Sequence, residues 1–450
     1  MGDRKEIETD LTKLMLIMSG QNITKLYYKT LAPNDNSKNQ PYFGADFSVL
    51  NIIPTGELEA SQSTSGKKSK SSVKFTASLD FYWMNSDGNI SKAPNAQLIL
   101  YPQYPEVRFS GFLKGCGNAP SELMNPLKRG RDNGRVLFLG VSNDGSVIGY
   151  LASPESILSQ QAIDMTPDFK HGLFGEIKLS IGNNKSQLLS ELRRIHGLGW
   201  IKGKRLKKDN SHVDCNSSNC GGYTLEAELG ITPNGYSEPD YLGWEIKQYS
   251  VPSFGRDYSK VITLMTPEPT GGFYKKEGVI DFLYKFGYAD KSGKKNRINF
   301  SSPHRIGETN KTTNLSLELI GYDKASNKIT DASGGIALVS RDEEIAALWG
   351  FSHIIDHWKR KHAQAAYIPS LSKNEGFREY HYSNTIKLGE GTDFFKLLSA
   401  MVNKDIYYDP GIKMENAHSK NPKTKRRSQF RVSSRKLASL YHSMSDEKLC

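Results

Sequence analysis

Two carboxylates and one ammonium group lie close together in the stretch Pro239-Asp-Tyr-Leu-Gly-Trp-Glu-Ile-Lys247. Residues 242–248 predict a short β-strand, in which residues two apart lie on the same face. Glu245 and Lys247 are therefore expected to point the same way, whereas Ile246 points into a core. This alternation predicts a strand with one functional face and one buried face.

Asp240 stands just before this strand, where Pro239 favours extended or turning backbone, so its carboxylate can join the other two groups. Phosphodiester hydrolysis needs a neutralised phosphate and an activated water, and a hard divalent cation supplies both. Mg²⁺ suits a site with two carboxylates, so Asp240 and Glu245 are the predicted metal ligands. Lys247 is expected to orient the attacking water. Glu226, in a helix predicted to open at Thr224, is a fourth catalytic candidate.

The spacing of these groups also fits an ordinary ion pair at a solvated strand edge. Several further segments favour the nuclease, because residues 187–450 resemble the catalytic domain of the MvaI and BcnI type restriction endonucleases. The segments that carry the resemblance are 188–195, Gly199-Trp200, 222–226, 239–247, 263–266 with Pro269, and 429–432. The resemblance implies an α/β PD-(D/E)xK fold of the MutH-like kind, with Asp240, Glu245 and Lys247 as its acid, acid and lysine.

The resemblance also implies a function: a type II restriction endonuclease that cuts both strands of double-stranded DNA with Mg²⁺. Its expected site is short and C/G-rich, with CCWGG as the first candidate, where W is A or T. The expected enzyme is a monomer that cuts one strand and then the other, and its host is expected to have a cognate DNA methyltransferase. Two alternatives stay open: a strand-nicking repair enzyme of the MutH type, and a catalytically silent DNA-binding regulator.

Length, charge and cysteine content constrain the chain further. Its 450 residues predict two or three domains, with residues 1–180 in front of the nuclease domain at 187–450. A formal net charge of +12 is typical of a protein that neutralises phosphates. No apolar run approaches the length of a membrane span, so no membrane partner is expected.

The 4 cysteines suit a reducing interior and a cytoplasmic location. A zinc site at His212, Cys215 and Cys220 is less favoured than a polar surface loop.

The front domain is predicted to be a small β-barrel, since its segments are rich in β-branched and aromatic residues. Asn143-Asp144-Gly145 predicts a tight hairpin turn, and residues 61–72 predict a flexible loop. A β-rich domain ahead of such a nuclease is similar to the arrangement in UbaLAI, which implies a B3-like pseudobarrel of the EcoRII effector type that binds a second DNA site. The DNA-binding candidates there are Arg108, Lys114, Lys128, Arg129, Arg131 and Arg135, and an ordinary basic face is the alternative.

Two basic segments of the second half are predicted to contact DNA. Arginine can pair with both acceptors of guanine, so Arg426, Arg427 and Arg431 are the candidates for base contacts. By the resemblance Arg431 matches a base-recognition position, but Lys425-Arg426-Arg427 stands where family members carry histidines. Candidates for other DNA contacts are Lys413, Lys202, Lys204 and Arg205. His353 and His357 are four apart and could bind metal, although a core-packed element is favoured.

Overall fold

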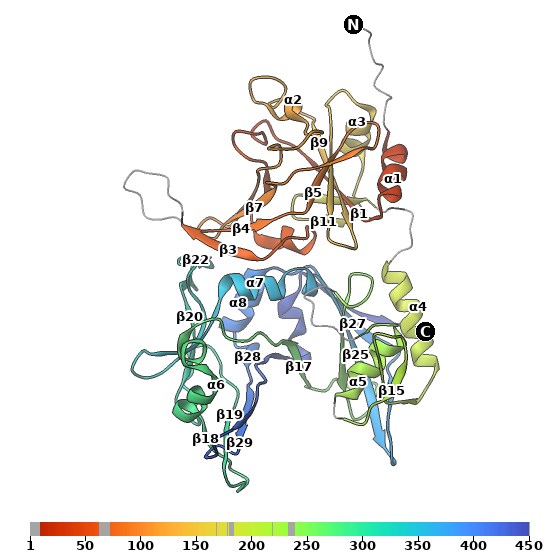
Figure 1. Cartoon of the computed structure of the whole chain (residues 1–450). Coiled ribbons are helices and arrows are strands. Elements are labelled where there is room, and N and C mark those ends of the chain that lie inside the picture. Colours follow the sequence, from red (N-terminus) through yellow and green to blue (C-terminus); the bar gives the residue numbers. More distant parts are fainter. Residues whose placement is uncertain are drawn as a thin grey trace. The chain divides into compact units, whose positions relative to one another are not determined.

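The computed structural model describes residues 10–62, 73–167, 169–177, 179, 184–217, 219–232 and 239–449. The chain divides into two compact units, residues 1–183 and 184–450, coloured red to yellow and yellow-green to blue in Figure 1. Most of the loop predicted at 61–72 and the segment 181–183 lie outside the described residues. In the part of the chain that is described, no helix is long and apolar enough to cross a membrane.

The described residues of unit 1 form two sheets and three α-helices. A seven-stranded sheet has the order β11-β12-β1-β9-β10-β5-β6, and a five-stranded sheet has the order β2-β8-β7-β4-β3. Its strands are β1 (Ile23–Thr30), β2 (Tyr42–Gly44), β3 (Leu58–Gln62), β4 (Val73–Ser78), β5 (Phe81–Met84), β6 (Ile90–Lys92), β7 (Gln97–Tyr101), β8 (Glu106–Ser110), β9 (Val136–Ser142), β10 (Val147–Ala152), β11 (Phe169–His171) and β12 (Phe174–Ile177). Its helices are α1 (Leu11–Gly20), α2 (Ser121–Met124) and α3 (Ile157–Asp164), with a 3₁₀ turn η1 (Phe47–Asn51).

One hydrophobic core of unit 1 lies between the seven-stranded sheet and two of the helices. Leu14 and Met18 of α1 pack with Leu158 of α3 against the sheet, and every residue of β9 is buried. The hairpin predicted at residues 143–145 is confirmed, because β9 and β10 pair antiparallel on either side of it. The B3-like pseudobarrel stays a prediction.

Unit 2 is built on a mixed sheet of order β13-β26-β25-β27-β32, with β16 paired parallel to β25. The strands of this sheet are β13 (Ile201–Lys202), β16 (Glu245–Ser250), β25 (Gln364–Asn374), β26 (Arg378–Tyr382), β27 (Thr385–Glu390) and β32 (Ser443–Lys448). Helices α4 (Asn184–Gly197) and α5 (Cys220–Glu228) pack against it. Leu188, Leu192 and Ile195 of α4 join Ile246 in one hydrophobic core.

Smaller sheets fill the rest of unit 2, as Figure 1 shows around β18, β20 and β28. Their strands are β14 (Lys204–Leu206), β15 (His212–Asp214), β17 (Val261–Met265), β18 (Tyr288–Ala289), β19 (Arg297–Ser301), β20 (Ser316–Ile320), β21 (Tyr322–Asp323), β22 (Lys328–Ile329), β23 (Gly335–Val339), β24 (Ile345–Gly350), β28 (Ile406–Tyr408), β29 (Gly411–Glu415), β30 (Lys423–Lys425) and β31 (Phe430–Ser433). The remaining helical elements are α6 (Gly272–Phe286), α7 (Phe351–Trp358), α8 (Phe394–Val402), η2 (Arg360–His362) and η3 (Ser434–Leu440). Helix α7 is the packed element predicted around His353 and His357.

Two expected element starts are wrong. The strand begins at Glu245, because Tyr241 and Trp244 exchange backbone hydrogen bonds across a turn with positive φ at Leu242 and Gly243. Helix α5 begins at Cys220 and not at Thr224. The Thr224 hydroxyl donates to the Cys220 carbonyl at 2.7 Å, so it bonds back inside the helix instead of capping it.

The cysteines also differ from expectation. We expected reduced thiols, but Cys215 and Cys220 form a disulfide with their Cα atoms 5.7 Å apart. The chain turns back between β15 and α5, which brings the two within the usual range for a disulfide. Both sulfurs are therefore unavailable to the alternative zinc site with His212.

Candidate active site

The start of β16 presents Glu245 and Lys247 on one face of the sheet. The Lys247 ammonium forms an ion pair with Glu245 Oε1, whereas Ile246 between them is 6% exposed and lies in the core. The expected alternation along this strand is therefore confirmed. Packing of Ile246 in the core on the opposite face holds the strand in place, so Glu245 and Lys247 are both attached to a rigid backbone.

Asp240 is held beside these two groups by the turn that precedes the strand. Its Oδ2 accepts a hydrogen bond at 3.0 Å from the backbone N–H of Ile246. The turn at 241–244 folds the chain back on itself, so Asp240 lies next to the strand although it comes before the turn. Local backbone geometry thus brings three of the predicted groups together.

Glu226 reaches the same place from another element. It lies near the end of α5, which packs against β16. Burial, followed by the charge of Asp240, raises the pKa of Glu226 to about 7, and Glu245 adds to this effect. All four predicted catalytic residues therefore interact electrostatically at one site.

Glu245 is the most deeply buried group of this site. Its side chain is 1% exposed, and among the described residues Oε2 accepts no hydrogen bond. Burial raises the pKa of Glu245, with Asp240 adding to the shift and the lysines opposing it. Burial opposes the charge of Lys247, but the carboxylates of Glu245, Asp240 and Glu226 outweigh it and the pKa of Lys247 is raised.

The sequence prediction missed Lys361, which belongs to η2 just before β25. Its Nζ lies 3.5 Å from Glu245 Oε2. The parallel register pairs Glu245 with Ala365, and this brings the chain just before β25 to the start of β16. No local pattern marks Lys361, since its partner is remote in sequence.

The chemistry of these side chains fits a hard divalent cation. Within the described residues, no group of three or more His, Cys, Asp or Glu side chains is placed to hold a metal ion. Mg²⁺, however, needs only one or two protein carboxylates, because it keeps several waters. Glu245 Oε2 is buried without a hydrogen bond, and the crowded carboxylates raise the pKa values of Glu226 and Glu245. A bound cation would compensate the charge at Glu245 Oε2, and it would lower the raised pKa values of Glu226 and Glu245.

Glu226→Gln should stabilise the protein at alkaline pH when EDTA keeps divalent metal away. The folded pKa of Glu226 is about 7, above the ordinary glutamate value of 4.5, so the folded state holds this proton more tightly. Stability is therefore lost as pH rises from 4.5 to about 7, and Gln removes that loss. Urea unfolding should give a gain of up to roughly 3 kcal/mol near pH 8 and little gain near pH 5. An equal effect at both pH values would contradict the burial of this carboxylate.

The basic cluster near β14 is partly engaged with acidic side chains. Lys202 pairs with Asp214 at 2.8 Å and Lys204 pairs with Glu228 at 2.5 Å. Arg205 is exposed, with its guanidinium 5.1 Å from the centroid of the Tyr223 ring. Since Tyr223 and Glu228 both belong to α5, the cluster lies along the helix that carries Glu226.

The candidates for base contacts lie on β31 and the segment before it. Arg431 donates to Asp409 Oδ2 at 2.7 Å and to Gln429 Oε1 at 2.5 Å. Arg426 and Arg427 are exposed. Lys413 lies on β29 and pairs with Glu415 at 3.0 Å. Five apolar residues in and after this segment are buried and hold it against unit 2: Phe430, Val432, Leu437, Leu440 and Tyr441.

The front-domain candidates separate into different surroundings. Arg108 pairs with Glu106 at 3.2 Å, and Arg129 pairs with Asp132 and Glu155 at 3.0 and 2.6 Å. Lys114, Lys128 and Arg131 are exposed. Arg135 is wrong as a surface candidate, because it is 0% exposed and donates to the backbone carbonyls of Ala32, Asp35, Leu123 and Asp132. These hydrogen bonds stabilise the fold of unit 1, and they leave Arg135 unavailable for DNA.

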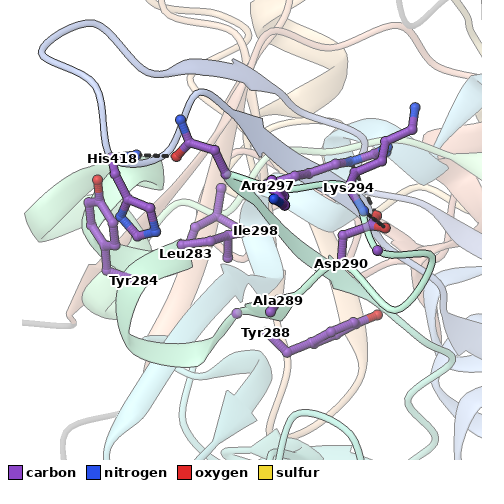
Figure 2. Close-up of a pocket in the computed structure, with 13 residues that line it drawn as sticks. Leu283, Tyr284, Tyr288, Ala289, Asp290, Lys294, Arg297, Ile298 and His418 are labelled. Atoms are coloured by element: carbon purple, nitrogen blue, oxygen red, sulfur yellow. Dashed lines mark hydrogen bonds and ion pairs between the residues drawn. The ribbon is translucent and has the colours of Figure 1, made fainter.

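A separate pocket of unit 2 lies between α6 and β19, as Figure 2 shows. Its volume is about 400 Å³. It is lined by Tyr284, Lys294, Arg297 and His418 among others, and by none of the predicted catalytic residues. Two of its polar groups have partners: Arg297 lies 3.5 Å from Asp290, and the His418 backbone N–H donates to Asn296 at 2.6 Å. We assign no role to this pocket.

Comparison with known proteins identifies the second unit. The model of the MvaI/BcnI restriction endonuclease family matches residues 189–441. A solved structure described as restriction endonuclease MvaI in complex with cognate DNA substrate is similar at 18% identity and a TM-score of 0.43, covering 60% of this chain and 100% of that chain. MvaI in the absence of DNA gives 17% identity and a TM-score of 0.31, covering 59% and 98%. Comparison with curated protein sequences gives no match. The family match spans more than half of the chain and confirms the resemblance: the chain belongs to the MvaI/BcnI restriction endonuclease family.

Proposed function

We propose that this protein is a Mg²⁺-dependent type II restriction endonuclease that cuts both strands of double-stranded DNA at a short C/G-rich site. The observation that carries the proposal is the convergence of Asp240, Glu245 and Lys247 at the start of β16, in a chain of this family. CCWGG is the first candidate site, and the products are 5′-phosphate and 3′-hydroxyl ends. The proposed enzyme is a cytoplasmic monomer accompanied in its host by a cognate methyltransferase.

The residues of the site divide the chemistry between them. Asp240 and Glu245 would hold Mg²⁺, which when bound neutralises the phosphate and makes water more acidic. Lys247 donates hydrogen bonds to the attacking water or to a phosphate oxygen and stabilises the charge that develops there. With a pKa of about 7, Glu226 can accept a proton near neutral pH.

Incubation of supercoiled plasmid with the purified protein and Mg²⁺ tests the proposal against both alternatives. Linear fragments with fixed ends support a restriction enzyme, and sequencing of those ends gives the site and the cut position. Open circles alone would support the MutH-like nickase. A gel shift without any cleavage would support the silent regulator and exclude both enzymes.

Unit 1 is proposed to be an effector domain that binds a second copy of the site, which makes the enzyme type IIE. A groove in unit 1 supports this, with a volume of about 1370 Å³ and the basic residues Arg108 and Lys170 in its lining. Phosphate binding in such a groove needs cationic side chains.

The effector proposal predicts that a plasmid with two sites is cut faster than a plasmid with one. Adding a short duplex that contains the site should speed cleavage of the one-site plasmid. Arg108→Ala should remove this stimulation and leave basal cleavage intact. Lys92→Ala is the matched control, because Lys92 forms an exposed ion pair with Asp80 in the same unit and does not line the groove. Equal rates on all substrates would exclude an effector role.

A further inference from the structure

Lys361 is placed beside the active site by an element with no predicted role in it. It belongs to η2, the short turn that joins α7 to β25. Its Nζ lies 3.5 Å from Glu245 Oε2; the Lys361 side chain is 25% exposed and that of Glu245 only 1%. The ammonium therefore lies between solvent and a buried carboxylate.

The turn that carries Lys361 is anchored in the core of unit 2. His362 is 0% exposed, and its ring stacks on Trp358 with the centroids 4.3 Å apart and the planes at 16°. Trp358 Nε1 in turn donates to Thr392 Oγ1 at 3.3 Å. Residues on both sides of Lys361 are thus fixed by packing, which holds its backbone against the start of β16.

Glu245 has two ammonium partners, one at each carboxylate oxygen. Lys247 contacts Oε1, and Lys361 lies near Oε2. A buried carboxylate needs at least one compensating charge, because removing it from water is costly. If Lys247 were the sole partner, any movement of its ammonium toward DNA would leave Glu245 uncompensated. A second lysine removes that conflict.

The charge balance of the site supports the same conclusion. Glu226, Asp240 and Glu245 contribute three negative charges when ionised, and Lys247 and Lys361 contribute two positive charges, so one negative charge is left. Adding a divalent cation leaves one positive charge, which a single phosphodiester neutralises. Without Lys361 the loaded site would be neutral and would stabilise less well the negative charge that develops on the phosphate during cleavage.

We propose that Lys361 is a positioning residue of the active site that shares Glu245 with Lys247 and so frees the Lys247 ammonium for the scissile phosphate. The inference rests on the proposed nuclease function, since the phosphate is the group that draws Lys247 away. Lys361 acts through Lys247 and Glu245 and need not itself contact the DNA.

Lys361→Met tests the inference with the full-length protein. Its kcat for plasmid cleavage should fall by roughly 10–100-fold with little change in KM for DNA. Mg²⁺ binding in the absence of DNA, followed by thermal shift or calorimetry, should be as tight as in the wild type or tighter, because one repelling cation is gone. Lys361→Arg should recover most of the rate, since it restores the charge.

Lys185→Met is the matched control. Lys185 bridges Glu390 and Glu447 at 3.5 and 2.9 Å and is 34% exposed. Glu390 pairs in register with Gln364, next to Ala365, so it lies on the face of the sheet opposite Glu245. Cleavage by this variant should match that of the wild type.

Three outcomes would overturn the inference: wild-type cleavage by Lys361→Met, weakened Mg²⁺ binding in step with the lost rate, or a Lys361→Arg variant as slow as Lys361→Met. Weakened metal binding would indicate a merely structural role. Failure of the wild-type protein to cut any plasmid would instead contradict the proposed function itself, so the two failures are distinguishable.

Discussion

Asp240→Asn and Lys247→Met should each lower the rate of plasmid cleavage by roughly 10³-fold or more, because Asp240 is a proposed Mg²⁺ ligand and Lys247 stabilises the charge that develops on the phosphate. Asn keeps an oxygen that can accept the hydrogen bond from the Ile246 N–H, so the turn before β16 should persist. Met keeps the length of Lys247 without its charge. Single-turnover cleavage at saturating Mg²⁺ gives the rate.

Both variants should retain their fold and their DNA binding. Circular dichroism and thermal melting check the fold, and a gel shift with Ca²⁺ in place of Mg²⁺ checks binding. Lys185→Met is again the control, with the wild-type rate expected. If either variant cuts DNA at the wild-type rate, the assignment of these residues is wrong.

Gly389→Val should lower the free energy of unfolding by roughly 3 kcal/mol or more, because it overpacks a closed contact. A Cβ at Gly389 would lie 2.5 Å from the ring of Tyr441. Tyr441 is 3% exposed, and its hydroxyl is 2.8 Å from that of Tyr367, which pairs in register with Lys247. Displacement of this ring should also slow cleavage. Urea unfolding followed by tryptophan fluorescence measures the loss.

Gly197→Val is the control for that prediction. Gly197 ends α4, and nothing lies within 4 Å of a Cβ built there. Valine is a better helix former than glycine, so the stability should be unchanged or slightly higher. Equal stability of the two variants would contradict the packing of Tyr441 over β27.

Much of the fold follows from short-range patterns. The alternation at 245–247 and the hairpin at 143–145 both depend on neighbouring residues, and the structure contains both of them. The predicted start of β16 was wrong because Leu242 and Gly243 adopt positive φ, which strand periodicity does not reveal. The prediction that Arg135 lies on a DNA-binding surface was wrong, because Arg135 is buried by hydrogen bonds to carbonyls of segments that are remote in sequence.

The sequence by itself determined that Asp240, Glu245 and Lys247 lie close together, since one turn and one strand connect these three residues. Only the tertiary structure decided what surrounds them. The parallel pairing of β16 with β25 brings in Lys361, and the packing of α5 brings in Glu226. The physical reason is that strand periodicity and turn geometry are local, whereas burial and charge at a site come from segments that meet only when the chain folds.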